Sequence, residues 1–188
     1  MEKTLRTQTN LSGYNNDWYQ PGSFAKQLLW YFANRLFINT YLPYPSGFKV
    51  WLLKMFGAQL GPGVVIKPKV NIKYPWFLKI GENSWIGENV WIDNLIMVTI
   101  ESNVCLSQGC MLLTGNHDYT KSSFDLKVKP IVLESGVWIG AGAVVCPGVH
   151  AGSHAVLTVN SVATGNLDTY CIYQGNPAKY VKTREISH

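Results

Sequence analysis

The sequence lacks the marks of several protein classes. Its four cysteines show no CxxC or other metal-binding spacing, which predicts reduced, buried thiols. No window approaches the roughly 18 uncharged apolar residues of a membrane-spanning helix, and no secretory signal opens the chain. The net charge is +5, but lysine and arginine are dispersed, so we expect no nucleic-acid partner. These absences favour a cytoplasmic protein, and 188 residues suit one domain with appendages.

What the sequence does have is a period of six. From Leu60 onward an apolar residue recurs at every sixth position, with three interruptions. Thirteen of the fifteen residues in this frame are Ile, Leu or Val. A period of six marks a hexapeptide parallel β-helix, in which these side chains point inward and form the core. The frame is Leu60, Ile66, Ile72, Ile80, Ile86, Ile92, Ile100, Leu106, Leu112, Leu133, Ile139, Val145, Ala151, Leu157 and Ala163.

Glycine or asparagine stands three residues after eleven of the fifteen frame positions. These two residue types best tolerate a positive φ, which a sharp corner between short strands requires. The pattern therefore predicts corners at Gly63, Asn83, Asn89, Asn103, Gly109, Gly115, Gly136, Gly142, Gly148, Asn160 and Asn166.

The interruptions of the period divide the repeat into coils. Known hexapeptide proteins use three hexapeptides per triangular coil, which gives five coils here, at 60–77, 80–97, 100–117, 133–150 and 151–168. The interruptions at 78–79, 98–99 and 118–132 then all fall at one corner of the prism. We predict an all-β fold, a parallel β-helix of about five coils over 60–168 with an inserted loop at 118–132, followed by a C-terminal cap at 169–188.

Residues 1–59 form a separate, aromatic-rich extension. Apolar side chains follow a helical period at 24–38 and at 48–56, so two helical stretches are predicted, the first with Ser23 as its N-cap. An open β-helix exposes strand edges at both ends, which this extension and the tail would cap. The aromatic and cationic composition leaves two further roles open, a subunit contact and a peripheral contact of residues 23–57 with the inner face of a membrane.

The longest interruption begins beside a histidine. His117 is the last residue before the 118–132 loop, and loops of that length in a compact domain are usually functional. A histidine at this position is a candidate general base or a surface residue without a role. His150 and His154 follow on later coils, and three histidines at a prism corner also raise a zinc site resembling the gamma-class carbonic anhydrases. No nearby carboxylate clearly orients a ligand, and we expect no metal.

Three segments resemble the hexapeptide acyltransferases, in the branch with the maltose and galactoside O-acetyltransferases and the nodulation acetyltransferases. They are TGNHDY (114–119), KPIVLESGVWIGAGAVVCPGV (129–149) and YQGNPAKYVK (173–182). More narrowly, FGAQLGPGVVIKPKVNIKYPW and GENVWIDNL resemble acetyltransferases of colanic acid and other bacterial exopolysaccharide biosynthesis. The resemblance implies a left-handed β-helix, a homotrimer with three active sites between neighbouring subunits, and acetyl-CoA as co-substrate.

The resemblance also implies roles for single residues on the acceptor side. His117 matches the catalytic base of the family, which takes a proton from the acceptor hydroxyl. Asp93 and Asn94 match the region where relatives contact the acceptor sugar, and hydrogen bonds to sugar hydroxyls suit both residue types. We add Asn116, which stands beside the base. The alternative for Asp93 and Asn94 is plain turn chemistry.

On the donor side, the resemblance assigns residues of the last two coils and the tail. The turn from Trp138 to Ala141 matches the place where relatives hold a donor for the developing charge on the carbonyl oxygen. Relatives often have a hydroxyl residue where this chain has Ala141, which leaves its backbone N–H as the candidate. The implied contacts to the pantetheine arm are Val159 and Thr164, and those to the phosphates of CoA are Lys179 and Lys182.

The sequence thus predicts an acetyl-CoA-dependent O-acetyltransferase that acts on a hydroxyl of a saccharide or polysaccharide precursor by direct transfer. Two alternatives stay open, an N-acyltransferase acting on an amino sugar and a non-catalytic or metal-binding β-helix protein. A cysteine nucleophile is the mechanistic alternative, but Cys110 and Cys146 stand inside repeat units and are predicted to belong to the core. The loop residues 121–129 have no predicted role.

Overall fold

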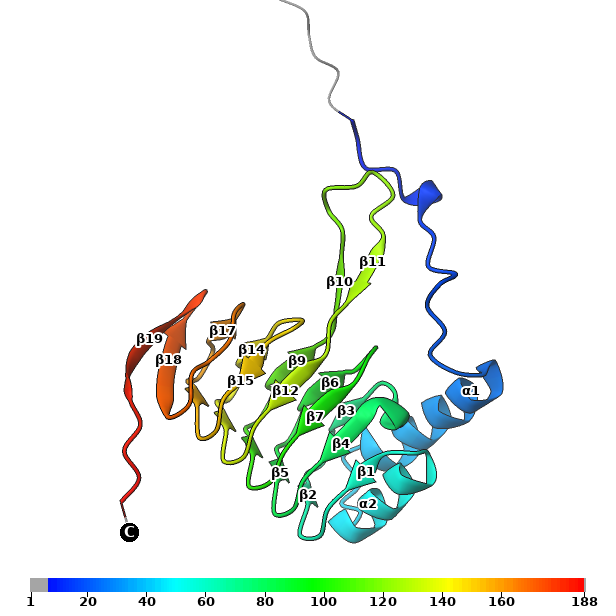
Figure 1. Ribbon diagram of the computed structural model, residues 1–188. Coiled ribbons are helices and arrows are strands. Elements are labelled where there is room, and N and C mark those ends of the chain that lie inside the picture. Colours follow the sequence, from blue (N-terminus) through cyan, green and yellow to red (C-terminus); the bar gives the residue numbers. More distant parts are fainter. Residues whose placement is uncertain (1–6, 188) are drawn as a thin grey trace, which may run out of the picture.

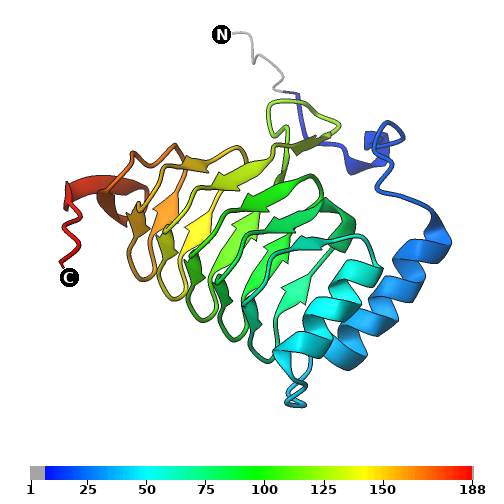
Figure 2. The ribbon, with the colours of Figure 1, turned by 60° about the horizontal axis from the view of Figure 1, so that its bottom comes forward.

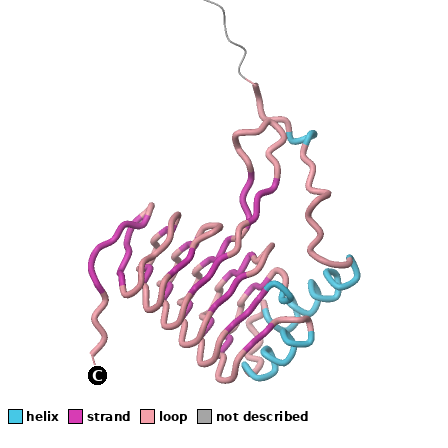
Figure 3. The backbone as a smooth tube through the Cα atoms, viewed as in Figure 1, coloured by secondary structure: helices cyan, strands magenta, loops and turns pink. Residues whose placement is uncertain are grey.

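The computed structural model describes residues 7–187. The chain forms a parallel β-helix with helices at one end (Figure 1). The helices are confined to the N-terminal part and to one turn in the first coil, whereas short strands joined by loops make up the rest (Figure 3). The helical elements are η1 (Leu11–Gly13), α1 (Phe24–Ala33), the π-helix η2 (Asn34–Ile38), α2 (Ser46–Met55) and η3 (Pro75–Phe77).

Three sheets form the sides of the prism, and neighbouring coils pair in parallel within each sheet. The first sheet contains β1 (Gln59–Leu60), β4 (Leu78–Ile80), β7 (Val98–Ile100), β12 (Ile131–Leu133) and β15 (His150–Ala151). The second contains β2 (Val65–Ile66), β5 (Trp85–Ile86), β8 (Cys105–Leu106), β13 (Trp138–Ile139), β16 (Val156–Leu157), β18 (Cys171–Gly175) and the antiparallel β19 (Ala178–Thr183). The third contains β3 (Asn71–Ile72), β6 (Trp91–Asp93), β9 (Met111–Leu113), β14 (Val144–Val145) and β17 (Val162–Ala163).

The six-residue frame is the core of the prism. All fifteen frame residues are buried, and the most exposed of them, Leu60, is only 7% exposed. Each buried Ile, Leu or Val side chain contributes about 1.5–3 kcal/mol through the apolar surface that it removes from water. The predicted register of the β-helix is therefore confirmed position by position.

The positive φ angles predicted for the corners are present with two exceptions. Nine of the eleven glycines and asparagines have a positive φ, and so do Lys69 and His154, which occupy the same frame position in their coils. Gly115 and Asn166 do not. Gly115 instead begins strand β10, and the side chain of Asn166 accepts a hydrogen bond from the backbone N–H of His150. Both exceptions stand at the corner between the third and first sheets, where the chain is inserted or capped differently.

That corner carries the three interruptions, as the sequence predicts. The long one forms a β-hairpin of β10 (Gly115–His117) and β11 (Leu126–Val128), which projects sideways from the prism (Figure 1). Its strands pair Gly115 with Val128 and His117 with Leu126. The excursion therefore begins at Gly115, two residues before the end of the predicted third coil, because the antiparallel pairing of the hairpin replaces the last part of that coil. His117 lies on the hairpin, not on a rung of the prism.

The N-terminal helices close one end of the prism and form two packed rods there (Figure 2). The indole N–H of Trp30 donates to the carbonyl of Ile72, and the ammonium of Lys49 donates to the carbonyls of Ile66 and Lys67. Lys49 is fully buried, and burial lowers its pKa. These bonds satisfy carbonyl groups that the open edge of the first coil would otherwise leave unpaired. Lys49, one of the cations behind the predicted membrane contact, is thus a cap inside the protein.

The tail closes the other end. Leu167 forms a bridge to Ala151, and β18 pairs in parallel with β16, so the chain begins a partial sixth coil before it turns back. Strand β19 then pairs antiparallel with β18 and leaves no further parallel rung to add. Among residues 7–187, no helix combines the length and the apolar character that a membrane crossing requires.

Candidate active site

The hairpin holds His117 in one orientation. Its Nδ1 lies 2.9 Å from the carbonyl oxygen of Phe124, at the far side of the hairpin loop. A carbonyl oxygen can only accept, so Nδ1 carries the proton of this hydrogen bond. In the neutral imidazole, Nε2 then keeps its lone pair and can accept a proton from a ligand. The geometry gives His117 the tautomer that a general base needs.

Phe124 positions the imidazole in two ways. Its ring stacks on that of His117, with 4.5 Å between centroids and 9° between planes, and its carbonyl accepts the Nδ1 proton. Phe124 also has a φ of 55°, a left-handed conformation that bulky side chains rarely adopt. Residues held in this region cost about 1–3 kcal/mol and cluster at functional sites. A strained backbone at the residue that orients the candidate base points to a constraint of function.

An ion pair stabilises the hairpin beside His117. Lys127 Nζ lies 2.8 Å from Asp118 Oδ2, and Thr120 donates to Asp118 Oδ1 from both its backbone and its hydroxyl. Hydrogen bonds from Lys127 and then Thr120 lower the pKa of Asp118 to about 2. The carboxylate is committed to the hairpin and is not free to act as a second base.

A first cavity of about 460 Å³ opens on one side of His117. The hairpin forms one wall, and the extended N-terminal segment that runs from the hairpin to α1 forms another (Figure 1). Tyr19 of this segment donates to the carbonyl of Leu95 over 2.6 Å, and the ring of Tyr14 lies 5.9 Å from that of His117. The cavity is lined by Tyr14, Asn16, Tyr19, Lys73, Tyr74, Asp93, Leu95, Gly115, Asn116, His117 and Leu126.

Asp93 is the charged centre of the first cavity. Its Oδ1 lies 3.1 Å from Lys73 Nζ, and no described residue donates a hydrogen bond of good geometry to that oxygen. Burial raises the pKa of Tyr74, and the Asp93 carboxylate raises it further. Burial likewise raises the pKa of Tyr19, with smaller contributions from Tyr74 and Asp93. Both phenols are therefore neutral hydrogen-bond donors beside a carboxylate with unused acceptor capacity.

The structure separates the two acceptor residues predicted from the IDNL segment. Asp93 lines the cavity, whereas Asn94 is fully buried. The Asn94 amide accepts from the backbone N–H groups of Lys73 and Tyr74 and donates to the carbonyl of Tyr74. Asn94 therefore holds the corner of the preceding coil, which fits the turn chemistry that was the alternative to a role as a substrate ligand. Asn116, the third predicted acceptor residue, is exposed and lines the first cavity.

A second cavity, of about 370 Å³, opens on the other side of His117. It shares Asn116 and His117 with the first, so the imidazole stands between two spaces. Of the predicted donor-binding residues, Thr164 lies here. The lining residues are Asn116, His117, Asp118, Tyr119, Thr120, Lys127, Lys129, Cys146, Pro147 and Thr164.

The other predicted donor-binding residues are not in either cavity. Ala141 and Val159 stand at the corner between the second and third sheets, at the opposite edge of the third sheet from the hairpin. Within the described residues the backbone N–H of Ala141 makes no hydrogen bond to another backbone group, so it remains an available donor. Trp138 is half exposed on the second sheet. Lys179 and Lys182 are exposed on the terminal strand β19.

The other two histidines do not join His117. His150 Nε2 lies 2.7 Å from Glu134 Oε1 on the first sheet, and the ring of His154 packs against Tyr170 with 4.6 Å between centroids. Within residues 7–187, no group of three or more His, Cys, Asp or Glu side chains is placed to hold a metal ion. The three histidines therefore do not form a zinc site like that of the gamma-class carbonic anhydrases.

Several lining residues escaped the sequence reasoning. Tyr14 and Tyr19 lie in a polar segment whose path along the hairpin has no local signature. Phe124 lay in the unassigned part of the loop. Lys73 could have been found, because it directly follows Ile72 as Asp93 follows Ile92, and Ile72 pairs with Ile92. Opposite charges at the same position of adjacent coils predict an ion pair.

The chain resembles known proteins over most of its length. No family model matches it. It is 31% identical over 176 residues to "Putative colanic acid biosynthesis acetyltransferase WcaF" of Escherichia coli (strain K12), over 93% of this chain and 97% of that protein. It is 28% identical to the galactoside O-acetyltransferase of the same organism, over 72% of this chain and 68% of that one. A hexapeptide-repeat acetyltransferase of Vibrio cholerae, solved with acetyl coenzyme A, matches the fold with a TM-score of 0.77 at 24% identity, over 89% of this chain and 93% of that chain.

Proposed function

Because this chain belongs to the acetyltransferase family that includes WcaF, we propose that it transfers an acetyl group from acetyl-CoA to a hydroxyl of a saccharide or saccharide-lipid intermediate. One observation carries the proposal. His117 stands between two cavities with its Nδ1 proton held by a carbonyl, which leaves Nε2 open to a ligand. Two substrates that meet at one base need two such spaces.

The transfer is direct. Nε2 of His117 accepts the proton of the acceptor hydroxyl while that oxygen forms a bond to the thioester carbonyl carbon. The resulting tetrahedral intermediate collapses, the carbon–sulfur bond breaks, and the proton passes from the imidazolium to the leaving CoA thiolate. The thioester is already activated, so much of the acceleration comes from holding both substrates in line. The products are an acetyl ester and CoA.

The cysteines of the repeat argue against an acyl-enzyme. Cys146 lines the second cavity, but burial raises the pKa of its thiol. Burial also raises the pKa of Cys110, to about 12. The thiolate is the nucleophilic form, and both environments disfavour it.

We assign the first cavity to the acceptor and the second to the donor. Asp93 and Asn116 offer hydrogen bonds to sugar hydroxyls in the first. In the second, Thr164 would contact the pantetheine arm, and Lys127 and Lys129 would add positive charge for the phosphates. The names of two relatives, colanic acid biosynthesis and galactoside, support a carbohydrate acceptor.

The predicted donor residues outside these cavities are explained if the protein is a trimer. Ala141 and Val159 lie across the third sheet from His117, too far around the prism to serve the same chain's base. In a ring of three copies, this corner of one subunit would face the hairpin of the next. The Ala141 N–H would then stabilise the oxyanion formed by the neighbour's reaction. Trp138, Lys179 and Lys182 would contact the same CoA from the second subunit.

The proposal is tested by product analysis with the purified full-length chain. CoA release from acetyl-CoA is measured with a panel of neutral glycans, and the acetylated product is identified by mass and by its lability to mild base, which cleaves esters and not amides. An acetyl ester on a glycan is the expected product. Acetylation of amino sugars alone would favour the N-acyltransferase, and no release with any acceptor would contradict the proposal. Light scattering measures the expected trimer.

A further inference from the structure

The N-terminal helices form a plate whose outer face is unusually apolar. In α1 and η2, Trp30, Asn34 and Ile38 are buried against the first coil. At about 100° per residue, positions 29, 32 and 36 fall on the opposite side of the same helix. Those positions are Leu29, Phe32 and Leu36, which are 64%, 55% and 57% exposed.

Helix α2 repeats this arrangement. Lys49, Leu52 and Leu53 are buried against the coil, whereas Trp51 and Met55 lie on the opposite side of the helix and are exposed. The segment between the helices adds Tyr41 and Leu42, at 75% and 56% exposure. We call this set the plate face: Leu29, Phe32, Leu36, Tyr41, Leu42, Trp51 and Met55. The two helices that carry it lie at one end of the prism (Figure 2).

The charge around the plate face is of one sign. Between residues 18 and 81, which include both helices and the whole first coil, the chain has eight Lys and Arg and no Asp or Glu. These eight are half of the protein's 16 Lys and Arg residues; of them, Lys49 is the buried cap and Lys73 pairs with Asp93. Arg35, Lys54 and Lys67 are exposed. An apolar face surrounded by cations matches the interface of an anionic bilayer, where aromatic rings enter the headgroup layer and cations contact phosphates.

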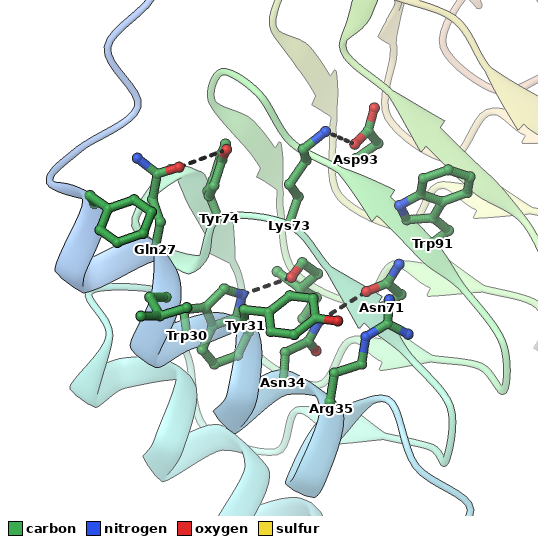
Figure 4. Close-up of a pocket in the computed structure, with 13 residues that line it drawn as sticks. Gln27, Trp30, Tyr31, Asn34, Arg35, Asn71, Lys73, Tyr74, Trp91 and Asp93 are labelled. Atoms are coloured by element: carbon green, nitrogen blue, oxygen red, sulfur yellow. Dashed lines mark hydrogen bonds and ion pairs between the residues drawn. The ribbon is translucent and has the colours of Figure 1, made fainter.

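A groove lies beside α1, next to the proposed acceptor cavity. A cavity of about 440 Å³ lies between α1 and the third sheet, lined on the helix by Phe24, Leu28, Tyr31 and Arg35 (Figure 4). Its far side is formed by Lys73, Tyr74 and Asp93, which also line the first cavity beside His117. The groove beside α1 and the proposed acceptor cavity therefore share one wall.

From these features we propose that the plate face docks the protein on anionic lipid surfaces. The alternative occupant, a second copy through the same face, would bring two cationic surfaces together with no acidic residue from 18–81 to compensate. A lipid surface supplies the missing negative charge. The docking involves no spanning segment, since the helices lie flat on the end of the prism. It does not depend on the proposed reaction.

The test is co-sedimentation of the full-length chain with vesicles of phosphatidylglycerol and phosphatidylcholine, and with vesicles of phosphatidylcholine alone. We expect binding to the anionic vesicles that weakens in high salt. The variant Leu29→Ser/Phe32→Ser/Trp51→Ser should lose at least about tenfold in partitioning, because three apolar anchors are removed. The matched control Trp85→Ser/Val181→Ser/Ile186→Ser removes three comparably exposed apolar residues from outside the plate and should bind as wild type.

Folding and assembly are checked in the same samples. Circular dichroism shows whether each variant is folded, and light scattering gives its oligomeric state. Equal binding by the folded plate variant, or no binding of wild type to anionic vesicles, would overturn the proposal. A change of oligomeric state in the plate variant without vesicle binding by wild type would make the face a contact between copies instead. A His117→Ala variant should bind vesicles normally, which separates this proposal from the proposed reaction.

Discussion

His117 and His150 close equivalent coils in the sequence frame, yet the structure gives them opposite chemistry. The hairpin lifts His117 off the prism, and its Nδ1 is bound to a carbonyl while Nε2 faces two cavities. His150 stays on the first sheet, where Glu134 occupies its Nε2. A base needs an unoccupied nitrogen beside a space for its substrate, and His117, which lines two cavities, meets this need without a carboxylate on its Nε2. The inserted hairpin, more than the histidine itself, makes the site.

The largest effect should come from truncating the two histidines in parallel. His117→Ala should lower kcat by at least about a hundredfold, the usual contribution of a general base. His150→Ala should leave kcat within about twofold, since the residue touches neither cavity and a surface ion pair contributes little. Steady-state CoA release checks both. Comparable losses in the two variants would remove the distinction on which the mechanism rests.

Removing the ring of Phe124 tests whether the orientation of the His117 imidazole affects catalysis. Phe124→Gly relieves the positive φ and keeps the carbonyl, but it removes the ring that packs on His117. We expect kcat to fall about tenfold with KM nearly unchanged, because misorientation of the base acts on the reaction step. Steady-state kinetics, with each substrate varied in turn, separate the effect on kcat from the effect on KM. Full activity would mean that the carbonyl alone fixes the imidazole.

The N-terminal segment that forms a wall of the first cavity lies beside His117 and not beside His150. Tyr19→Phe deletes the hydroxyl that donates to the Leu95 carbonyl. One hydrogen bond contributes about 1 kcal/mol net, so the acceptor KM should rise about fivefold while the KM for acetyl-CoA stays constant. An equal change in both KM values would show that the segment supports the whole hairpin instead of the acceptor cavity.

The smallest predicted effect is the pH dependence of the stability that Asp118 gives to the hairpin. The folded-state pKa of Asp118, about 2, lies below the unfolded value of about 3.9. Its contribution to stability is therefore complete above about pH 4 and is lost as the pH falls toward 2. Asp118→Asn should lower the thermal midpoint slightly near neutral pH, and the difference from wild type should disappear at about pH 2. A difference that persists unchanged in acid would assign the effect to packing.

Periodic parts of this protein were predictable from sequence and aperiodic parts were not. The β-helix register follows from one physical demand, an inward apolar residue at every sixth position, and Leu60 through Ala163 obey it. His117 was found by its place beside the insertion. The buried position of Asn94 was not predictable, because an amide that caps backbone groups has the same residue type as one that binds a ligand. Phe124 and Tyr19 act through contacts over seven and 76 residues of sequence, which no local pattern encodes.

The stack of coils also sets a height. Rungs of a parallel sheet are spaced about 4.8 Å apart, and a helix lying on the first rung is about 10 Å thick. The hairpin leaves from β9, on the third rung, so His117 stands about 20 Å above a surface on which the plate rests. If the plate face docks on a lipid surface as proposed, the number of coils before the hairpin sets the distance between His117 and that surface. Deleting the coil at 80–97 would bring His117 about 4.8 Å closer to that surface.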